Sequence, residues 1–206
     1  MIERRFISVE SEILVWKIEE TIEELLKQFS DFSFYKSDYA KINSDKHRFQ
    51  FLASRLALKI LLNGDAFVVY DQNGKPSLKD DTRNISISHS GDYVAIIVNS
   101  THAVGIDIEM KSERFARLYQ RYLSQIEQAE LFDKSDLTKV QLAWSAKETL
   151  YKILGGESGE FVENLRILPF VPAHSGNIAA IYNPTNKHFL LNYITTDNYN
   201  LVWMEE

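Results

Sequence analysis

The spacing of apolar and polar positions predicts strands and helices in turn along the first half of the chain. Residues 12–18 (EILVWKI) form a predicted strand, and a helix is predicted just after it because Thr21 and Glu24 have the spacing of a capping box. A second, longer helix is predicted from Ser44, a suitable N-cap, to the Asn-Gly pair at 63–64. The segment "AFVVYDQNGKPSL" that follows predicts a strand running into an Asn-Gly turn.

Three short strands are predicted between residues 84 and 109, namely "NISIS", "DYVAIIV" and "AVGIDIE". The links "HSG" and "NSTH" have the length of hairpin turns, so the pattern predicts a meander. The first and third strands of a meander run parallel. We therefore expect Ser88 and His89, at the end of the first strand, to lie at the same sheet edge as Asp107 and Glu109.

A second group of helices and strands is predicted after residue 111. The segment "SERFARLYQRYL" predicts a helix, Ser124 and Glu127 form a second capping box, and a long helix is predicted from "LTKVQLAW" to the glycine pair at 155–156. Strands are predicted near 178–182, 187–195 and 199–204. Each half then contains strands and a long helix. This favours an α+β fold of two similar halves, 1–101 and 102–206, with antiparallel sheets.

The composition is that of a globular protein with a sizeable core, since 45% of the 206 residues are hydrophobic and 25% are charged. The absence of cysteine excludes disulfides and thiolate metal sites. A net charge of −6 argues against a general nucleic-acid-binding surface. The apolar runs are too short to span a membrane, and "MIERRFISVE" lacks the apolar core of a signal peptide, so a cytoplasmic protein is expected.

Two carboxylates stand on one face of the strand predicted in "VGIDIEMK", residues 104–111. Because successive strand side chains point to opposite faces, Asp107 and Glu109 point the same way, about 6.6 Å apart along the chain. Like charges at that spacing repel one another unless the face is well solvated or a positive charge lies between them. The segment is therefore either a solvent-facing edge strand or part of a divalent-cation site.

The long helix around Glu148 has two distinct rows of side chains. Its apolar face consists of Val140, Ala143, Leu150 and Leu154. Trp144, Glu148 and Lys152, spaced by four, form another row well away from that face. A surface Glu–Lys pair is the simple interpretation, but a tryptophan on a fully solvated face is unusual. If this row faces the sheet edge, Glu148 supplies a third carboxylate, and the oxygen ligands suit Mg²⁺ beside a phosphate that the lysine contacts.

Basic residues elsewhere in the chain are candidates for phosphate contacts. Arg48, Arg55 and Lys59 fall within about 20° of one another on a helical projection, which also fits a solvated basic face. Lys75 lies in the predicted Asn-Gly turn, where a plain turn lysine is the simple alternative. His89 lies at a strand end, where a half-buried hydrogen-bond donor is the corresponding alternative.

Four motifs occur in the order and spacing of the 4′-phosphopantetheinyl transferases, and the chain resembles that family between residues 44 and 152. The motifs are "NGKP" (73–76), "ISISHSGDY" (85–93), "VGIDIE" (104–109) and "WSAKETLYK" (144–152). The length and layout are similar to the longer single-chain, surfactin-synthetase-activating type. They do not resemble the short trimeric holo-acyl-carrier-protein synthases.

The resemblance implies a reaction in which the 4′-phosphopantetheine arm of coenzyme A passes to a serine of an apo acyl or peptidyl carrier protein. Adenosine 3′,5′-bisphosphate would be the by-product. Asp107, Glu109 and Glu148 match the family's acidic ligands of Mg²⁺, for which Mn²⁺ is an alternative, on the pyrophosphate of the substrate coenzyme A. Glu148 and Lys152 are the expected catalytic residues, the first as the base for the serine hydroxyl and the second on the phosphates.

The positions that match the family's coenzyme A contacts come from both halves of the chain. They are Arg48, Gly74, Lys75, Pro76, Ser88, His89 and Lys152. We expect the nucleotide contacts in the N-terminal half, 1–101, and the metal site and carrier docking in the C-terminal half, 102–206. Arg48 resembles the arginine at the 3′-phosphate, and Lys147 matches the lysine that precedes the glutamate. A monomer is expected, because the two halves would build one site.

The carrier proteins that this family modifies are acidic, as is this chain, so docking requires a local basic patch. Arg114, Arg117 and Arg121 have i, i+3, i+7 spacing on one face of the predicted helix and are the candidate docking residues. A solvated helix face is the alternative.

Two other functions remain open at this point. One is a different Mg²⁺-dependent phosphoryl or nucleotidyl transferase that shares only the acidic cluster. The other is a non-catalytic relative that binds coenzyme A or a carrier protein. The presence of all three carboxylates together with Lys152 favours the enzyme.

Overall fold

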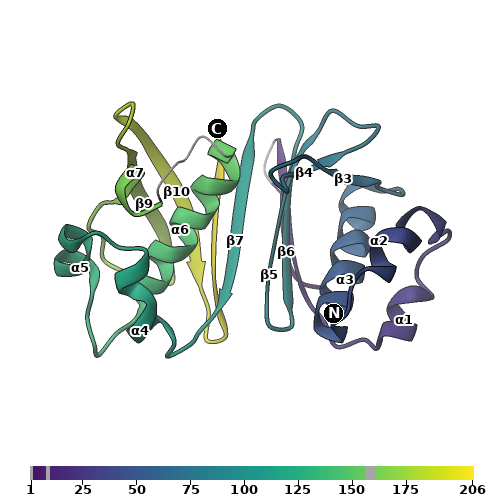
Figure 1. Ribbon diagram of the computed structural model, residues 1–206, viewed down its shortest axis with the longest axis horizontal. Coiled ribbons are helices and arrows are strands. Elements are labelled where there is room, and N and C mark those ends of the chain that lie inside the picture. The colour runs from purple at the N-terminus through teal and green to yellow at the C-terminus, as the bar shows by residue number, and fades with distance from the viewer. Residues whose placement is uncertain (1, 8–9, 156–160) are drawn as a thin grey trace. The chain divides into compact units, whose positions relative to one another are not determined.

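Two antiparallel sheets, one in each half of the chain, organise the computed structural model (Figure 1). The chain divides into two units, Met1–Ala103 and Val104–Glu206, which we call unit 1 and unit 2. The structure describes residues 2–7, 10–155 and 161–206. The predicted α+β class with antiparallel sheets is confirmed.

Unit 1 is built on a four-stranded sheet with the order β1-β2-β6-β5. Its strands are β1 (Ile2–Ile7), β2 (Ser11–Lys17), β5 (Asn84–Ser90) and β6 (Tyr93–Asn99). A separate hairpin is formed by β3 (Val68–Tyr70) and β4 (Pro76–Leu78). The helices are α1 (Ile22–Leu26), the 3₁₀ turn η1 (Ser33–Tyr35), α2 (Lys36–Ala40) and α3 (Asp45–Leu62).

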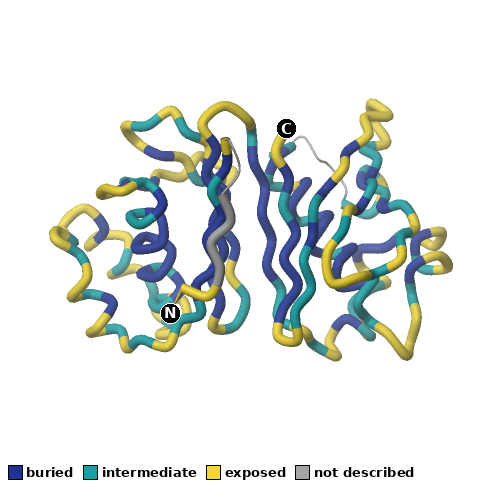
Figure 2. The backbone as a smooth tube through the Cα atoms, turned by 180° about the vertical axis from the view of Figure 1, so that it is seen from behind, coloured by how far each residue is buried: buried dark blue, intermediate teal, exposed yellow. Residues whose placement is uncertain are grey.

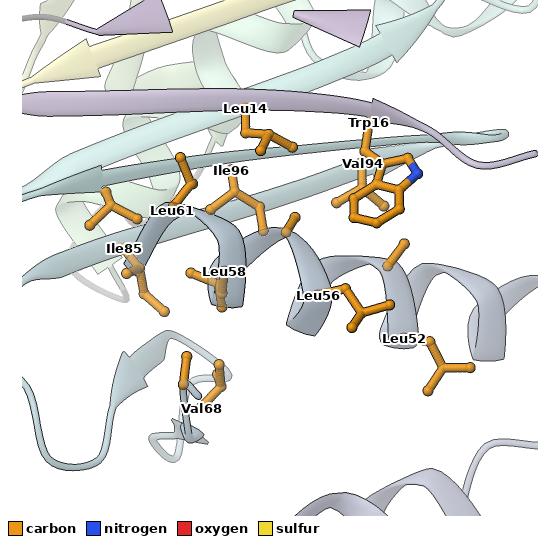
Figure 3. Packing of buried hydrophobic residues seen from close by; sticks show 14 of the residues in the cluster. Leu14, Trp16, Leu52, Leu56, Leu58, Leu61, Val68, Ile85, Val94 and Ile96 are labelled. Carbon is orange, nitrogen blue, oxygen red and sulfur yellow. The ribbon is translucent and has the colours of Figure 1, made fainter. Parts of the chain in front are cut away.

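The long helix α3 begins and ends where its sequence predicts. Ser44 Oγ accepts a hydrogen bond from the backbone N–H of His47 (3.4 Å), and Asn63 ends the helix in the left-handed conformation with a φ of 52°. α3 packs on β2 and β6 through the apolar side chains shown in Figure 3. The core residues of this interface include Leu14, Trp16, Val94 and Ile96 from the sheet and Leu52, Leu56, Leu58 and Leu61 from the helix.

All three strands predicted within residues 84–109 form, as β5, β6 and β7 (Val104–Met110), but the predicted pairing of the third strand with the second is wrong. β5 and β6 pair antiparallel, but β6 also pairs with β2 along its whole length. Because both edges of β6 are paired, it has no edge left for a third neighbour. The sheet edge on which Ser88 and His89 would meet Asp107 and Glu109 therefore does not form, since the two carboxylates belong to the other sheet.

Asn99 ends β6 and turns the chain out of the sheet. Its Nδ2 donates to Ser11 Oγ on β2 (2.6 Å), while its Oδ1 accepts the backbone N–H groups of Thr101 (2.7 Å) and His102 (2.6 Å). The Asn99 side chain thus shapes the link after β6. This link has the length of a hairpin turn, but it joins strands of two different sheets.

Unit 2 contains a five-stranded sheet with the order β7-β11-β10-β9-β8. Its strands are β7 (Val104–Met110), β8 (Leu165–Ile167), β9 (Ser175–Tyr182), β10 (Lys187–Thr195) and β11 (Tyr199–Glu205). Its helical segments are α4 (Phe115–Leu118), the 3₁₀ turn η2 (Tyr119–Arg121), α5 (Gln125–Leu131), α6 (Thr138–Leu154) and α7 (Phe161–Asn164). α6 packs across β7 and β11, and Figure 2 shows buried residues running along the strands of each unit.

The local signals in the sequence predict most of these elements. Both capping boxes form, at Thr21 and at Ser124, and α6 ends at Gly155 as predicted, whereas Gly156 lies outside the described residues. The single helix predicted after residue 111 is wrong, because α4 ends after one turn and continues as η2. Across the described ranges, no helix is both long enough and apolar enough to cross a lipid bilayer.

Gly105 sets the spacing between β7 and α6. A Cβ atom at this position would overlap the backbone oxygen of Thr149 and lie 2.9 Å from Ile153 Cγ1. Only a residue without a side chain lets the helix approach the strand this closely. Because strand side chains alternate, Gly105 shares its face of β7 with Asp107 and Glu109, so the glycine also brings both carboxylates against α6.

We predict that Gly105→Ala lowers the free energy of unfolding by about 1–3 kcal/mol, because the methyl group forces α6 away from β7. Urea denaturation measures the change. Gly64→Ala is the matched control, since its Cβ would lie 4.0 Å from the nearest such atom, the backbone oxygen of Leu62. The control should leave stability unchanged or raise it by up to about 1 kcal/mol. Equal losses in both variants would contradict the prediction.

Candidate functional site

The acidic face of β7 lies against α6 and not against solvent. Asp107 is only 5% exposed. Lys152 Nζ, from α6, donates to Asp107 Oδ1 (3.0 Å) and to the backbone oxygen of Ile106 (2.6 Å). The two carboxylates therefore do not face solvent, although β7 is an edge strand of its sheet. The second interpretation, a divalent-cation site, stays a prediction.

The row formed by Trp144, Glu148 and Lys152 faces this acidic strand. At one end of the row, Trp144 Nε1 donates to Glu109 Oε1 (3.0 Å), and at the other end Lys152 pairs with Asp107 (3.0 Å). Glu148 lies between them along the helix and feels the charges of both strand carboxylates. The structure thus brings the three predicted carboxylates and Lys152 together within unit 2.

The fold disfavours the ionised form of Glu148. Burial, first, and the charges of Asp107 and Glu109, second, raise the pKa of Glu148 from 4.5 to about 7, against an opposing effect of Lys152. Removal from water and like charges both disfavour the ionised form. A carboxyl group with a pKa near 7 is suited to accept a proton at neutral pH.

Glu109 is held from two directions. Its Oε1 accepts from Trp144 Nε1 (3.0 Å), and its Oε2 accepts from an Arg114 guanidinium nitrogen (2.7 Å). The indole ring packs edge-on against Tyr122, with ring centroids 5.1 Å apart, and against Phe161 at 5.7 Å. The tryptophan in the row is therefore an aromatic anchor whose N–H orients a carboxylate.

The donor chemistry of the cluster fits a hard divalent cation, since three carboxylates offer oxygen ligands of the kind that Mg²⁺ and Mn²⁺ take. In the part of the chain that the structure describes, no three acidic or histidine side chains form a ready metal centre. Asp107 is bonded to Lys152 and Glu109 to Arg114 instead. Burial and the charges of Asp107 and Glu109 raise the pKa of Glu148, so a further cation beside these three carboxylates would favour its ionised form.

A buried ion pair joins α6 to α5. Lys147 and Glu127 both have side chains that are 0% exposed, with Lys147 Nζ 2.9 Å from Glu127 Oε2. The ammonium group also donates to the backbone oxygen of Tyr122 (2.8 Å), and Glu127 Oε1 accepts the backbone N–H of Ile167 on β8 (2.8 Å). One pair of charges thereby ties α5, α6 and β8 together. Burial lowers the pKa of Lys147, and Glu127 opposes that shift.

Glu127 is a residue whose role the sequence reasoning missed, since we assigned it only to a capping box. The box does form. The signal is Lys147, which lies one turn from Ala143 and Leu150 and two turns from Val140 in the apolar face of the helix. A buried lysine requires a buried acid, so its position in that face already calls for a carboxylate partner.

Arg48 lies in the first turn of α3, the helix end that also borders a hollow in unit 1. Its Nε donates to the backbone oxygen of Ile42 (3.0 Å), and its guanidinium pairs with Asp45 (3.2 Å). The hollow, of about 460 Å³, is lined by residues 18–20, Lys46, Phe49, Gly91 and Asp92. It lies between the start of α3 and the β5–β6 turn, which are joined by a hydrogen bond from Gln50 Nε2 to the backbone oxygen of Gly91 (3.1 Å).

The other predicted coenzyme A contacts of unit 1 lie on two further elements. Residues 74–76 belong to the β3–β4 hairpin, where Gly74 takes a left-handed φ of 79° and Asp71 Oδ1 accepts two backbone N–H groups of the turn (2.8 and 2.9 Å). Ser88 and His89 are near the end of β5, the first buried and the second exposed. The predicted contacts of unit 1 thus come from a helix start, a turn and a strand end.

Arg55 does not continue a phosphate-facing row from Arg48 to Lys59. It is 4% exposed, donates to Tyr70 OH (2.8 Å), and lies 4.2 Å from the ring centroid of Phe51. Such a guanidinium is a core residue stabilised by aromatic faces. Both the solvated basic face and the shared phosphate row are therefore wrong for this position.

The three arginines predicted to dock a carrier do not share one face of a single helix. α4 ends at Leu118 and the chain continues as the 3₁₀ turn η2 to Arg121, so the α-helical spacing is not maintained. All three are exposed, but Arg114 is paired with Glu109 at 2.7 Å. Arg117 and Arg121 are the two that lie outside this pair.

Comparison with known proteins identifies the family. The family model of the 4′-phosphopantetheinyl transferase superfamily matches residues 103–202. The chain is 32% identical over 130 residues to the 4′-phosphopantetheinyl transferase AcpT of Salmonella typhi, covering 59% of this chain and 67% of that protein. It is 31% identical over 130 residues to AcpT of Salmonella typhimurium, with the same coverage. With AcpT of Escherichia coli K12 it shares 29% over 121 residues, 56% of this chain and 62% of that protein.

The chain belongs to the 4′-phosphopantetheinyl transferase superfamily, a family of transferases. This confirms the resemblance that the four motifs indicated. The match to the Salmonella relatives spans about two thirds of their length. The family model covers almost all of unit 2, the part that contains the acidic strand and the row on α6.

We predict that Lys147→Met lowers the free energy of unfolding by about 3–5 kcal/mol, because Glu127 is left buried without its cation. Urea denaturation measures the loss. Lys139→Met, on the same helix, should change stability by about 0.5 kcal/mol or less. A loss as small as that of the control would mean that the buried pair does not support α6.

We predict that Glu148 makes the metal-free chain less stable as the pH rises. The raised pKa means that the folded chain binds the proton more tightly than the unfolded chain, so its contribution is greatest below pH 4.5 and is lost as the pH passes about 7. The fall is up to about 3 kcal/mol. Chelator-treated Glu148→Gln should lack this fall in urea denaturation at about pH 5 and about pH 8, and the exposed control Glu163→Gln should retain it. Parallel profiles for all three proteins would contradict the prediction.

Proposed function

We propose that this chain transfers the 4′-phosphopantetheine arm of coenzyme A to a serine of an apo acyl or peptidyl carrier protein, releasing adenosine 3′,5′-bisphosphate. The observation that supports this most is the row of Trp144, Glu148 and Lys152 set against Asp107 and Glu109 within the part that the family model matches. Family membership alone would be compatible with a chain that had lost these groups. This chain has them, and the fold brings them together.

Glu148 is the base in this proposal. A serine hydroxyl is a weak nucleophile at neutral pH and needs a proton acceptor within hydrogen-bond reach. The serine oxygen forms a bond to the phosphorus that bears the pantetheine arm, the bond from that phosphorus to the oxygen of the adenosine bisphosphate breaks, and the serine proton passes to Glu148. Glu148 lies in the acidic cluster, where burial and the charges of Asp107 and Glu109 raise its pKa in the metal-free chain.

Asp107, Glu109 and Glu148 would hold the divalent cation, Mg²⁺ or Mn²⁺ in its place, which would neutralise charge on the pyrophosphate of coenzyme A. Lys152 would stabilise the same phosphate charges from α6. Its ammonium group already lies at the acidic strand, 3.0 Å from Asp107 Oδ1, and is fixed by the backbone oxygen of Ile106. A preorganised cation of this kind stabilises developing negative charge without reorienting during the reaction.

Unit 1 would bind the nucleotide part of coenzyme A through the three elements named above. Arg48 would contact the 3′-phosphate, residues 74–76 the adenine nucleotide, and Ser88 and His89 the phosphates. The exposure of His89 supports its access to a phosphate. The hollow at the start of α3, lined there by Lys46 and Phe49, leaves room for a ligand at that end of the helix. The presence of a sheet and a long helix in each unit of one chain supports the single-chain type and a monomer.

Carrier docking would use the exposed Arg117 and Arg121, which offer positive charge to an acidic partner. Arg114, the third candidate, contacts Glu109 in the structure and is less available to a partner.

The test is the intact mass of an apo carrier protein incubated with this chain, coenzyme A and Mg²⁺. We expect a gain of one phosphopantetheine arm that is absent with EDTA. Asp107→Asn should lower the rate by at least about 100-fold, because it removes a proposed metal ligand itself and not only a residue that orients a ligand. Asp133→Asn, which alters an exposed carboxylate of unit 2, should keep the full rate.

The possible failures separate the alternatives. No mass gain with several apo carriers, despite coenzyme A binding, would indicate a non-catalytic relative. No coenzyme A binding, with binding of another nucleotide, would indicate a different phosphoryl or nucleotidyl transferase. A mass gain that persists in Asp107→Asn would remove the acidic cluster from the proposed mechanism.

A further inference from the structure

Two cations of the chain itself occupy the acidic cluster, and they differ in how firmly they are held. Lys152 lies in the last turn of α6 and its side chain is about three quarters buried. It is hydrogen-bonded to the backbone oxygen of Ile106 as well as to Asp107. Arg114 comes from the segment between β7 and α4, and its side chain is 49% exposed. Its guanidinium contacts Glu109 and lies 4.9 Å from the ring centroid of Phe115.

The two carboxylate oxygens of Glu109 accept hydrogen bonds from one rigidly held donor and one mobile donor. Trp144 holds Oε1, and its ring is fixed by aromatic contacts with Tyr122 and Phe161. Arg114 holds Oε2, and it can return to water by rotating a side chain that is already half exposed. A cation that binds Glu109 therefore meets a fixed donor on one oxygen and a displaceable one on the other.

We propose that Arg114 is a tethered counter-cation that competes with the divalent cation for Glu109. This inference rests on the proposed function, because it takes Glu109 to be a metal ligand. In the metal-free chain Arg114 neutralises Glu109, and metal binding displaces it from Oε2. Arg114 thereby lowers the affinity of the cluster for the metal, both by occupying an oxygen and by repelling a second positive charge.

A purely structural role for Arg114 makes a different prediction. A half-exposed ion pair contributes little to stability, with a typical range of about 0–1 kcal/mol. If the pair were only structural, its removal would slightly destabilise the site and leave metal affinity unchanged or weaker. Competition predicts the opposite sign, a tighter metal complex on removal of the arginine.

The test is isothermal titration calorimetry of Mn²⁺, and separately of Mg²⁺, into the chelator-treated full chain. We expect Arg114→Gln to bind either metal about two- to fivefold more tightly than the unaltered chain, as expected for loss of one half-exposed pair. Arg114→Lys, which keeps a charge on a shorter side chain, should fall between the two. Arg117→Gln is the matched control, since it removes the same charge from a neighbouring exposed position and should leave metal affinity unchanged.

A second readout comes from Trp144, whose N–H is bonded to Glu109. Metal binding should alter its fluorescence in both the unaltered chain and Arg114→Gln, with the midpoint at lower metal concentration in the variant, and Trp144→Phe should abolish the signal. Metal binding of equal or lower affinity in Arg114→Gln would overturn the competition while leaving the metal site intact. Failure of the unaltered chain to bind either metal would remove the metal site, and with it this inference.

Discussion

The buried pair of Lys147 and Glu127 is the interaction on which the geometry of unit 2 depends. An ammonium and a carboxylate removed entirely from water are tolerated only when each meets the other and further polar groups. Here the further groups are backbone atoms of Tyr122 and Ile167, so the charges also join segments distant in sequence. Because Glu148 follows Lys147 directly, the same anchor determines how the helix presents its next residue to β7.

Neighbouring residues of one helix thus hold charges in opposite states. Lys147 is paired in the interior, whereas Glu148 lies beside two other carboxylates with too few cations to match them. The Lys147–Glu127 pair stabilises the fold, whereas the crowded charge of Glu148 destabilises it. The stability gained at Lys147 therefore offsets the cost of placing Glu148 beside two other carboxylates. A carboxylate kept in this unfavourable state is able to exchange protons and to gain from an added cation.

The local elements were largely predictable, and the pairing of distant strands was not. Capping boxes and the left-handed Asn63 act within a few residues, so Thr21, Ser44 and Ser124 identified helix starts correctly. The pairing of the third strand was not predictable, because its partner β11 lies almost a hundred residues away in the sequence. The length of the link after β6 gives no information about a partner that distant. Helical periodicity put Trp144, Glu148 and Lys152 in one row but left open whether that row faces β7, which the structure shows. The Arg114 contact depends on a broken helix that periodicity does not show.

Gly105 has a consequence for how this sequence can diverge. The distance between β7 and α6 is limited there first by a main-chain oxygen, that of Thr149, and then by the side chain of Ile153. Main-chain atoms are the same whatever residues surround them. Apolar neighbours can therefore be exchanged over many generations while the span between strand and helix stays constant. The glycine therefore sets the spacing, and a lineage that keeps it can vary the surrounding core without moving α6 away from the acidic strand.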